Sequence, residues 1–191
     1  MTIFWLIGVV VWLYGLSVFK RATLPTYYFI WGSVGLFFLL FFLSRPYWIW
    51  LMVQAVVGGV GVLLHPFDLV QIALGYGVIL IDNPAGALSL SIDYECSGVI
   101  ETIAFWSLLC FYPVYSLRKK VLLGLAGLFF IYLANVLRLV LIVGLVHYFG
   151  SPIFFLAHSI IGRLFFYVLI VYFYYRVFTY GYFTKYLGKG V

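Results

Sequence analysis

Charged residues are scarce in this sequence. They make up 8% of its 191 residues, and only five residues are acidic. Hydrophobic residues make up 66% and aromatic residues 23%, and the mean hydropathy is +1.19. These values lie far outside the composition of soluble domains, and no polar stretch is long enough for a separate soluble domain. The composition is typical of an integral membrane protein, and we expect residues 1–191 to form a single membrane domain.

Cysteine is also rare, and basic residues are dispersed. Cys96 and Cys110 are too few for a disulfide framework or a zinc knuckle, and we expect neither a metal nor a cofactor. The eleven Lys and Arg residues give a net charge of +6, but they are scattered between apolar runs and form no basic stripe. This distribution argues against nucleic acid as a partner and indicates the orientation of the chain in a membrane.

Apolar runs that can cross a bilayer recur along the chain. A hydrocarbon core of roughly 30 Å needs about 20 apolar residues in a helix. The runs that meet or approach this length cover about 2–19, 27–43, 47–64, 69–81, 98–117, a sixth run from Val121, and 158–175. We therefore predict an all-α polytopic transmembrane helix bundle of about seven spans, within a range of six to eight. The pattern does not decide whether 69–81 is a complete span or how 139–157 is organised.

Basic residues set the orientation of these spans, because Lys and Arg concentrate on the cytoplasmic side of membrane proteins. Eight of the eleven fall on one side of the predicted threading: Lys20, Arg21, Arg118, Lys119, Lys120, Arg176, Lys185 and Lys189. Arg45 falls on the other side, and Arg138 and Arg163 fall within apolar runs. We predict a multi-pass protein of the cell membrane with its N-terminus outside, its C-terminus in the cytoplasm, and the polar segment 82–97 outside.

A thiol, two acidic groups and a glycine occur together at 93–98, where the sequence reads Asp-Tyr-Glu-Cys-Ser-Gly. Helical rise of about 1.5 Å per residue converts sequence distance into depth. Counted from the nearest basic anchor at the inner boundary, Cys96 lies 22 residues away, and Arg138 and His158 each lie 18 residues away. These distances correspond to roughly 33, 27 and 27 Å. The spacing therefore predicts that all three residues meet near the outer face of the membrane.

These three residue types suit nucleophilic catalysis. A thiol attacks as a thiolate, which is favoured at a helix N-terminus and beside cations, and Cys96 has both available. His158 can act as general base toward the thiol and then as general acid toward a leaving amine. Arg138 can stabilise the oxyanion of a tetrahedral intermediate. An arginine inside an apolar helix costs roughly 2.5 to 3.5 kcal/mol unless it is paired or reaches water, so Arg138 marks a functional position.

Glu101 and Arg163 form a second pattern. Each lies five residues after a candidate catalytic residue, Cys96 and His158 respectively, and therefore about 7.5 Å further into the membrane. We predict that they form an ion pair that clamps the two helices together. Breaking one side of such a buried pair typically costs about 3 to 5 kcal/mol.

Other polar residues flank the candidate site. Asn135 lies three residues before Arg138 on the same helix face, where its amide can orient the guanidinium or a substrate backbone. Asp93 and Glu95 flank the thiol on the side of the water. They belong either to a solvated loop or to a contact for a cationic or amide group of a substrate.

Three short motifs in this order resemble the Cys, Arg and His signature of the exosortase and archaeosortase family: Glu95-Cys96-Ser97-Gly98, Asn135-Val136-Leu137-Arg138 and His158. The resemblance covers 93–163, and the chain is similar in size to compact members from Gram-positive bacteria. It implies a membrane cysteine transpeptidase with Cys96 as nucleophile, His158 as general base and acid, and Arg138 as transition-state stabiliser.

The resemblance also implies the partners. Such an enzyme cleaves the C-terminal sorting tail of a secreted protein and passes the new carboxyl end to an acceptor. The tail carries a short motif, a transmembrane helix and a basic cluster. Membrane lipid is the other expected partner.

Other functions fit the same residues. An intramembrane cysteine protease that hydrolyses without transfer needs the same three groups. A small transporter or lipid-binding membrane protein would instead use Arg138, Glu101 and Arg163, and it would remain active without Cys96. A metal site of Cys96, His158 and Glu101 is disfavoured, because Glu101 lies a helical turn or more deeper and the spacing is not that of metal ligands.

Overall fold

The computed structural model describes residues 2–45, 47–67, 69–73, 75–81, 88–92 and 96–180. Its long helices are α1 (Thr2–Arg21), α2 (Pro25–Leu43), α3 (Tyr47–Leu64), α4 (Val99–Phe111), α5 (Leu117–Phe149) and α7 (Gly162–Tyr174). Shorter helical turns are η1 (His65–Phe67), η3 (Ser151–Ile153), α6 (Phe154–Leu156), η4 (Ala157–Ile161) and η5 (Tyr175–Tyr180). The mostly helical architecture confirms the predicted class of a transmembrane helical protein.

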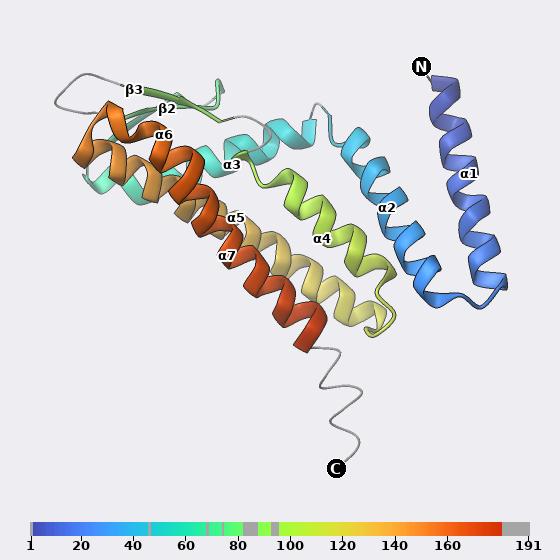
Figure 1. The fold of residues 1–191 in the computed structure, drawn as a ribbon. Helices are drawn as coiled ribbons and strands as arrows, with labels where there is room; N and C mark the ends of the chain where they lie inside the picture. The colour runs from blue at the N-terminus through green and yellow to red at the C-terminus, as the bar shows by residue number, and fades with distance from the viewer. Residues whose placement is uncertain are drawn as a thin grey trace, which may run out of the picture.

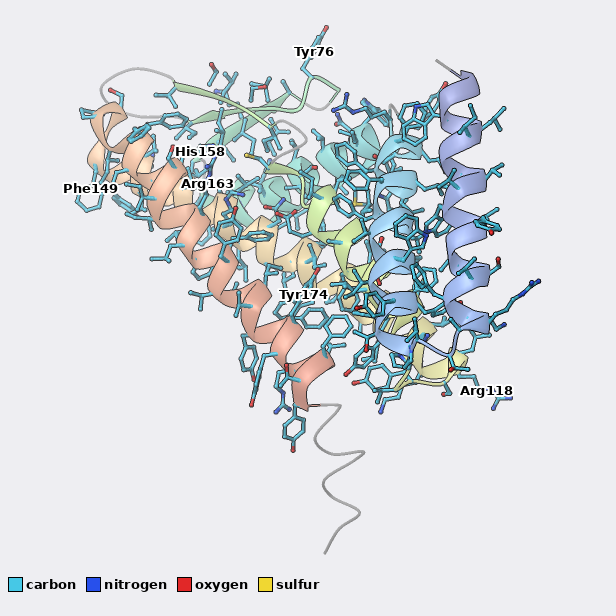
Figure 2. The ribbon with its side chains drawn as sticks, turned by 45° about the vertical axis from the view of Figure 1, so that its right-hand side comes forward. Tyr76, Arg118, Phe149, His158, Arg163 and Tyr174 are labelled. Carbon is cyan, nitrogen blue, oxygen red and sulfur yellow. The ribbon has the colours of Figure 1, made fainter. Side chains whose placement is uncertain are left out.

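The long helices run back and forth between two ends of the molecule (Figure 1). One end carries the β-strands and is called the sheet-bearing end. The other carries the connection between α4 and α5 with Arg118, and is called the basic end (Figure 2). α1 begins at the sheet-bearing end and α7 ends toward the basic end. α3 differs from the other helices, because it lies across the sheet-bearing end in both views.

Residues 69–81, predicted as a short fourth span, do not form a helix. They contain β1 (Val70–Ala73) and β2 (Val78–Ile81), which pair antiparallel with Val70 opposite Ile81. A third strand, β3 (Leu88–Ser91), pairs antiparallel with β2, so the strand order is β1-β2-β3. The prediction of an all-α fold is therefore wrong in this segment, and the count of seven spans is not confirmed.

The reason for the hairpin is local. The run is short for a span and rich in Val and Ile, which favour extended backbone. It is interrupted by Gly75 and Gly77, whose φ angles of +95° and +66° form the turn between the strands. Most other residues avoid such angles, so this glycine pair favours a turn over a continuous helix.

The stretch 139–157 continues α5 and then turns. α5 extends without interruption to Phe149, and the chain reverses at Gly150, where φ is +84°. Within the fully described helices, four stretches are long and apolar enough to cross a membrane: Pro25–Leu43, Tyr47–Phe67, Leu117–Phe149 and Ser151–Tyr180. α4 has 13 residues, or about 20 Å, and is shorter than a hydrocarbon core.

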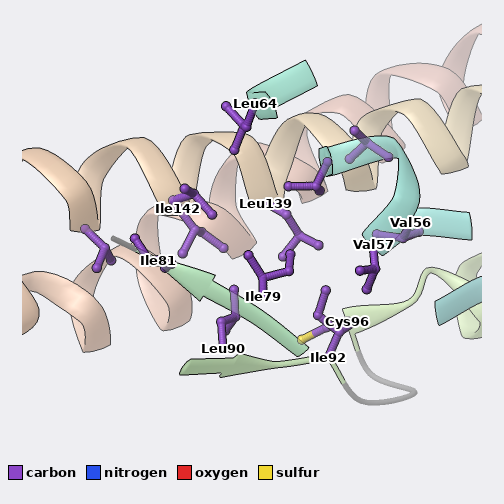
Figure 3. Packing of buried hydrophobic residues seen from close by; sticks show 14 of the residues in the cluster. Val56, Val57, Leu64, Ile79, Ile81, Leu90, Ile92, Cys96, Leu139 and Ile142 are labelled. Carbon is purple, nitrogen blue, oxygen red and sulfur yellow. The ribbon is translucent and has the colours of Figure 1, made fainter. Parts of the chain in front are cut away.

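The core of the sheet-bearing end joins three layers. Ile79 and Leu90 of the sheet pack in one buried cluster with Val57 of α3 and Leu139 of α5. Cys96 belongs to the same cluster, and Figure 3 shows its sulfur beside the strands. A second cluster lies between α4, α5 and α7 and includes Phe105 and Phe166, together with Leu109, Ile131, Ala134, Ile170 and Val177. The candidate nucleophile is thus fixed within packed core rather than in a free loop.

Candidate functional site

Cys96 lies where the chain leaves the sheet and enters α4. Gly98 precedes the first residue of α4 in the left-handed conformation, with φ +75° and ψ +11°. The Thr102 hydroxyl donates a hydrogen bond to the Gly98 carbonyl at 2.8 Å, and the Val99 backbone N–H donates to Ser97 Oγ at 3.4 Å. Since a residue with a Cβ rarely adopts this φ, Gly98 permits the sharp entry that leaves Cys96 at the helix end.

α5 presents Asn135 and Arg138 to this end of α4, on one helix face as their i,i+3 spacing requires. Asn135 has no exposed surface, and its Nδ2 donates a hydrogen bond to the carbonyl oxygen of Cys96. Arg138 is 4% exposed, and its Nη2 lies 3.8 Å from Cys96 Sγ. The guanidinium carbon lies 5.7 Å from the centre of the Phe166 ring on α7. The cation is therefore held beside the thiol by packing on both sides.

His158 reaches the thiol from the last helical segment, with its Nε2 3.8 Å from Cys96 Sγ. Its ring stacks on Phe154 at 5.7 Å between centres and 9° between planes. It lies in η4, a π-helical turn, and such wide turns are frequent at functional sites. The turn ends at Gly162, where a Cβ would lie 2.8 Å from Ile142 Cδ1 of α5. Glycine at this position lets the two helices approach closely enough for the histidine to reach α4.

Three buried polar atoms around the thiol have no hydrogen-bond partner within the described residues: Asn135 Oδ1, Arg138 Nε and His158 Nδ1. Buried unsatisfied groups typically cost about 1 to 3 kcal/mol each and are uncommon in folded proteins. They comprise an acceptor, a donor and a ring nitrogen whose role depends on the tautomer. The site therefore has unused capacity for the N–H and C=O groups of a polar ligand.

Glu101 and Arg163 do not form the predicted ion pair with each other. Arg138 acts electrostatically on Glu101, and both Arg138 and Arg163 act on His158. Figure 2 shows Arg163 beside His158 near the sheet-bearing end, and the Glu101 carbonyl oxygen accepts a hydrogen bond from the Tyr174 hydroxyl at 3.1 Å. Equal depth in a membrane does not specify which face of a helix a side chain occupies, and the prediction for this pair used depth alone.

Two predicted flanking residues, Asp93 and Glu95, lie outside the described residues. Ser97 is buried at the entry to α4. Sequence reasoning missed the aromatic contacts of Phe154 and Phe166. Phe154 precedes His158 by four residues, a spacing that places two side chains on one helix face and could have indicated the stack. No comparable local signal points from Phe166 to Arg138, because this contact joins two different helices.

The described residues contain no group of three or more His, Cys, Asp or Glu side chains that could hold a metal ion. At the described site, a thiol lies next to an imidazole and a guanidinium. A nucleophile within reach of a base and a fixed cation is the arrangement of covalent acyl transfer.

Comparison of the sequence with protein-family models gives a match over most of the chain. A family model described as "Transmembrane exosortase (Exosortase_EpsH)" matches residues 1–175. Comparisons with curated proteins and with solved structures give no match. The matched range contains all the helices from α1 to α7 and the residues Cys96, Arg138 and His158. Since it covers most of the chain, the protein belongs to the transmembrane exosortase family.

Proposed function

We propose that Cys96, His158 and Arg138 form the catalytic centre of a membrane cysteine transpeptidase that cleaves the C-terminal sorting tail of secreted proteins. Exosortases are membrane-embedded cysteine transpeptidases that act on secreted substrates with C-terminal sorting signals. The observation that carries the assignment is the position of Cys96 Sγ, 3.8 Å from both His158 Nε2 and Arg138 Nη2. These contacts give the thiol a proton acceptor on one side and a permanent cation on the other.

Acyl transfer then follows in two halves. His158 takes the thiol proton, the thiolate attacks the scissile carbonyl carbon, and Arg138 donates hydrogen bonds to the oxyanion. The C–N bond breaks as His158 gives its proton to the leaving amine, and a thioester remains on Cys96. An acceptor amine or hydroxyl attacks the thioester, His158 removes the acceptor's proton, and the thiol is regenerated.

Asn135 has two functions in this proposal. Its Nδ2 holds the carbonyl of Cys96, which fixes the backbone that carries the nucleophile. Its Oδ1 has no partner within the described residues and accepts a hydrogen bond from a backbone N–H of the substrate. The glycine entry at Gly98 supports the same function, because it keeps the backbone of Cys96 next to α5.

The location of the site supports an outward-facing reaction. Cys96 packs against the sheet, whereas Arg118 lies at the opposite end of the molecule. Because basic residues mark the cytoplasmic side, the sheet-bearing end faces outward. A sorting tail would then place its motif at Cys96, its apolar helix in the bilayer, and its basic cluster on the cytoplasmic side.

Co-expression with a secreted protein that carries a C-terminal motif, an apolar helix and a basic tail tests this function. Mass spectrometry of the product should show a shortened protein whose new carboxyl end is joined to an acceptor. A product with a free carboxylate in the presence of acceptor would instead identify a hydrolase. Retained activity in Cys96→Ala would contradict the proposal and favour the transporter alternative.

A further inference from the structure

We propose that a groove between α4 and α5 at the basic end binds one anionic phospholipid. The groove, called the basic groove, has a volume of about 300 Å³ and is lined by Trp106, Leu109, Tyr115, Lys120, Val121 and Leu125, among others. Its lining includes Leu117, the residue next to Arg118, and Figure 2 shows Arg118 at the end of the molecule opposite the sheet. The proposal does not depend on the catalytic assignment.

The walls of the basic groove suit an acyl chain. Val121 is 55% and Leu125 57% exposed, and in a membrane these apolar side chains face lipid. The Trp106 indole N–H donates a hydrogen bond to the Gly124 carbonyl at 3.2 Å, which fixes this ring of α4 against α5. Trp106 also lines a second apolar groove of about 290 Å³, which reaches Thr102 and Ser44. The two grooves thus border the same Trp106 side chain.

The charged groups at the opening of the basic groove are lysine ammonium groups. Lys120 folds back over the groove, and its Nζ donates to the Cys110 carbonyl at 2.6 Å. The Lys119 ammonium lies 4.7 Å from the centre of the Tyr115 ring, and Arg118 is the preceding residue. Two of the three consecutive cations are thus positioned at the groove by specific contacts.

Among the described residues, no acidic side chain is found beside this cluster. All five acidic residues of the sequence lie between 68 and 101, and α5 has no acidic residue in its first turn. Cations at a helix N-terminus also oppose the helix dipole, so their position is not explained by stabilisation of α5. A phosphate group complements both the ammonium groups and this end of the helix, while its diacylglycerol portion complements the apolar walls.

Membrane orientation alone is the competing explanation, because basic residues at the inner boundary set topology without any groove. That explanation requires only positive charge at this end of the molecule, and it does not need a defined binding site. It predicts that basic residues at the end of α1 attract anionic lipid as well as Lys119 and Lys120 do. A lipid site predicts that Lys119 and Lys120 attract anionic lipid more strongly than the basic residues at the end of α1 do.

The test measures bound lipid by native mass spectrometry of the full-length protein in detergent micelles. Phosphatidylglycerol or phosphatidylcholine with the same acyl chains is titrated into the sample. We expect one phosphatidylglycerol to bind selectively. The double variant Lys119→Gln, Lys120→Gln should weaken this binding about 25-fold, at about fivefold for each cation. The charge-matched control Lys20→Gln, Arg21→Gln should change it less than about twofold.

A second variant separates the groove from its charge. Val121→Trp fills the apolar wall and leaves all the cations in place, so it should also weaken phosphatidylglycerol binding. Size-exclusion chromatography and thermal unfolding confirm that each variant is folded. Equal losses in the two double variants, or unchanged binding in Val121→Trp, would overturn the proposal. Either result would assign the cations to general surface charge.

Discussion

The two ends of the molecule differ in the burial of their polar side chains. At the sheet-bearing end, Asn135 and Arg138 are buried with unused hydrogen-bond capacity around the thiol. At the basic end, Arg118 and Lys119 are exposed beside an apolar groove. The difference follows from packing, because the sheet, α3 and α5 enclose the first end, whereas the described residues place no comparable layer over the second. The enclosed end suits chemistry that needs fixed groups, whereas the open end suits exchangeable lipid.

The two cysteines give the sharpest test of this difference. Cys96 lies in the buried cluster, and Cys110 is exposed in the basic groove. We expect Cys96→Ala to lower substrate cleavage to background, a loss on the order of 10⁶-fold for a nucleophile. Cys110→Ala should change the rate less than about twofold. Gel-shift of a co-expressed substrate measures both, and comparable losses in the two variants would remove the distinction between the ends.

Substitutions on the inward and outward faces of β2 should differ in their effect on the stability of the protein. Ile79 has no exposed surface, whereas Leu80 is 36% exposed. Ile79→Ala leaves a cavity between the sheet and the helices and should destabilise the protein by about 2 to 5 kcal/mol. Leu80→Ala, on the opposite face, should cost about 0.5 kcal/mol or less. Thermal unfolding in detergent micelles compares the stability of the two variants. Equal shifts in Tm would mean that the sheet does not enclose this end.

Substitution of one arginine at each end tests whether a positive charge contributes to catalysis only beside the thiol. Arg138 lies beside the thiol and over Phe166, and Arg176 lies over Tyr180 at 4.7 Å. Arg138→Ala should lower kcat about 10²- to 10³-fold through loss of oxyanion stabilisation, and Arg138→Lys should restore part of it. Arg176→Ala should leave kcat unchanged. A KM effect without a kcat effect in Arg138→Ala would assign this arginine to substrate binding instead.

Asn135 gives the smallest expected effect. Asn135→Ala removes a hydrogen bond to the Cys96 carbonyl and leaves a buried acceptor unpaired, at a cost of about 1 to 3 kcal/mol. We expect kcat to fall about 10- to 100-fold, since 1.36 kcal/mol corresponds to tenfold. Asn135→Gln, which keeps the amide at a different reach, should recover little. Unchanged alkylation of Cys96 by a small maleimide in both variants would argue against a positioning function.

The convergence of Cys96, Arg138 and His158 was predictable because basic anchors mark one end of each helix. The depths themselves were less accurate. Residues 112–116 are a turn rather than helix, and α4 itself has 13 residues, or about 20 Å, so a count of 22 helical residues from Arg118 overstates the distance to Cys96. α5 is inclined in Figure 1, and a distance of about 27 Å along an inclined axis covers less depth. Both effects reduce the depth that the helices cover, so the residues still meet.

The sheet and the missing ion pair were not predictable by the same reasoning. Hydropathy cannot distinguish a short buried strand from part of a helix, and 69–81 consists of two strands around a glycine turn. Depth also carries no information on the direction in which a side chain leaves its helix, so it could not show whether the Glu101 and Arg163 side chains face each other. Both features depend on tertiary packing between segments that are distant in sequence.

The separation of the site residues along the chain has a consequence for biosynthesis. His158 follows Cys96 by 62 positions and Asn135 follows it by 39. A ribosome therefore delivers the nucleophile to the membrane before the residue that holds its backbone, and its base arrives later still. Until the last helix docks, the nascent protein carries the Cys96 thiol without the His158 imidazole beside it. Under the proposed function, the enzyme is therefore inactive until synthesis of the bundle is complete.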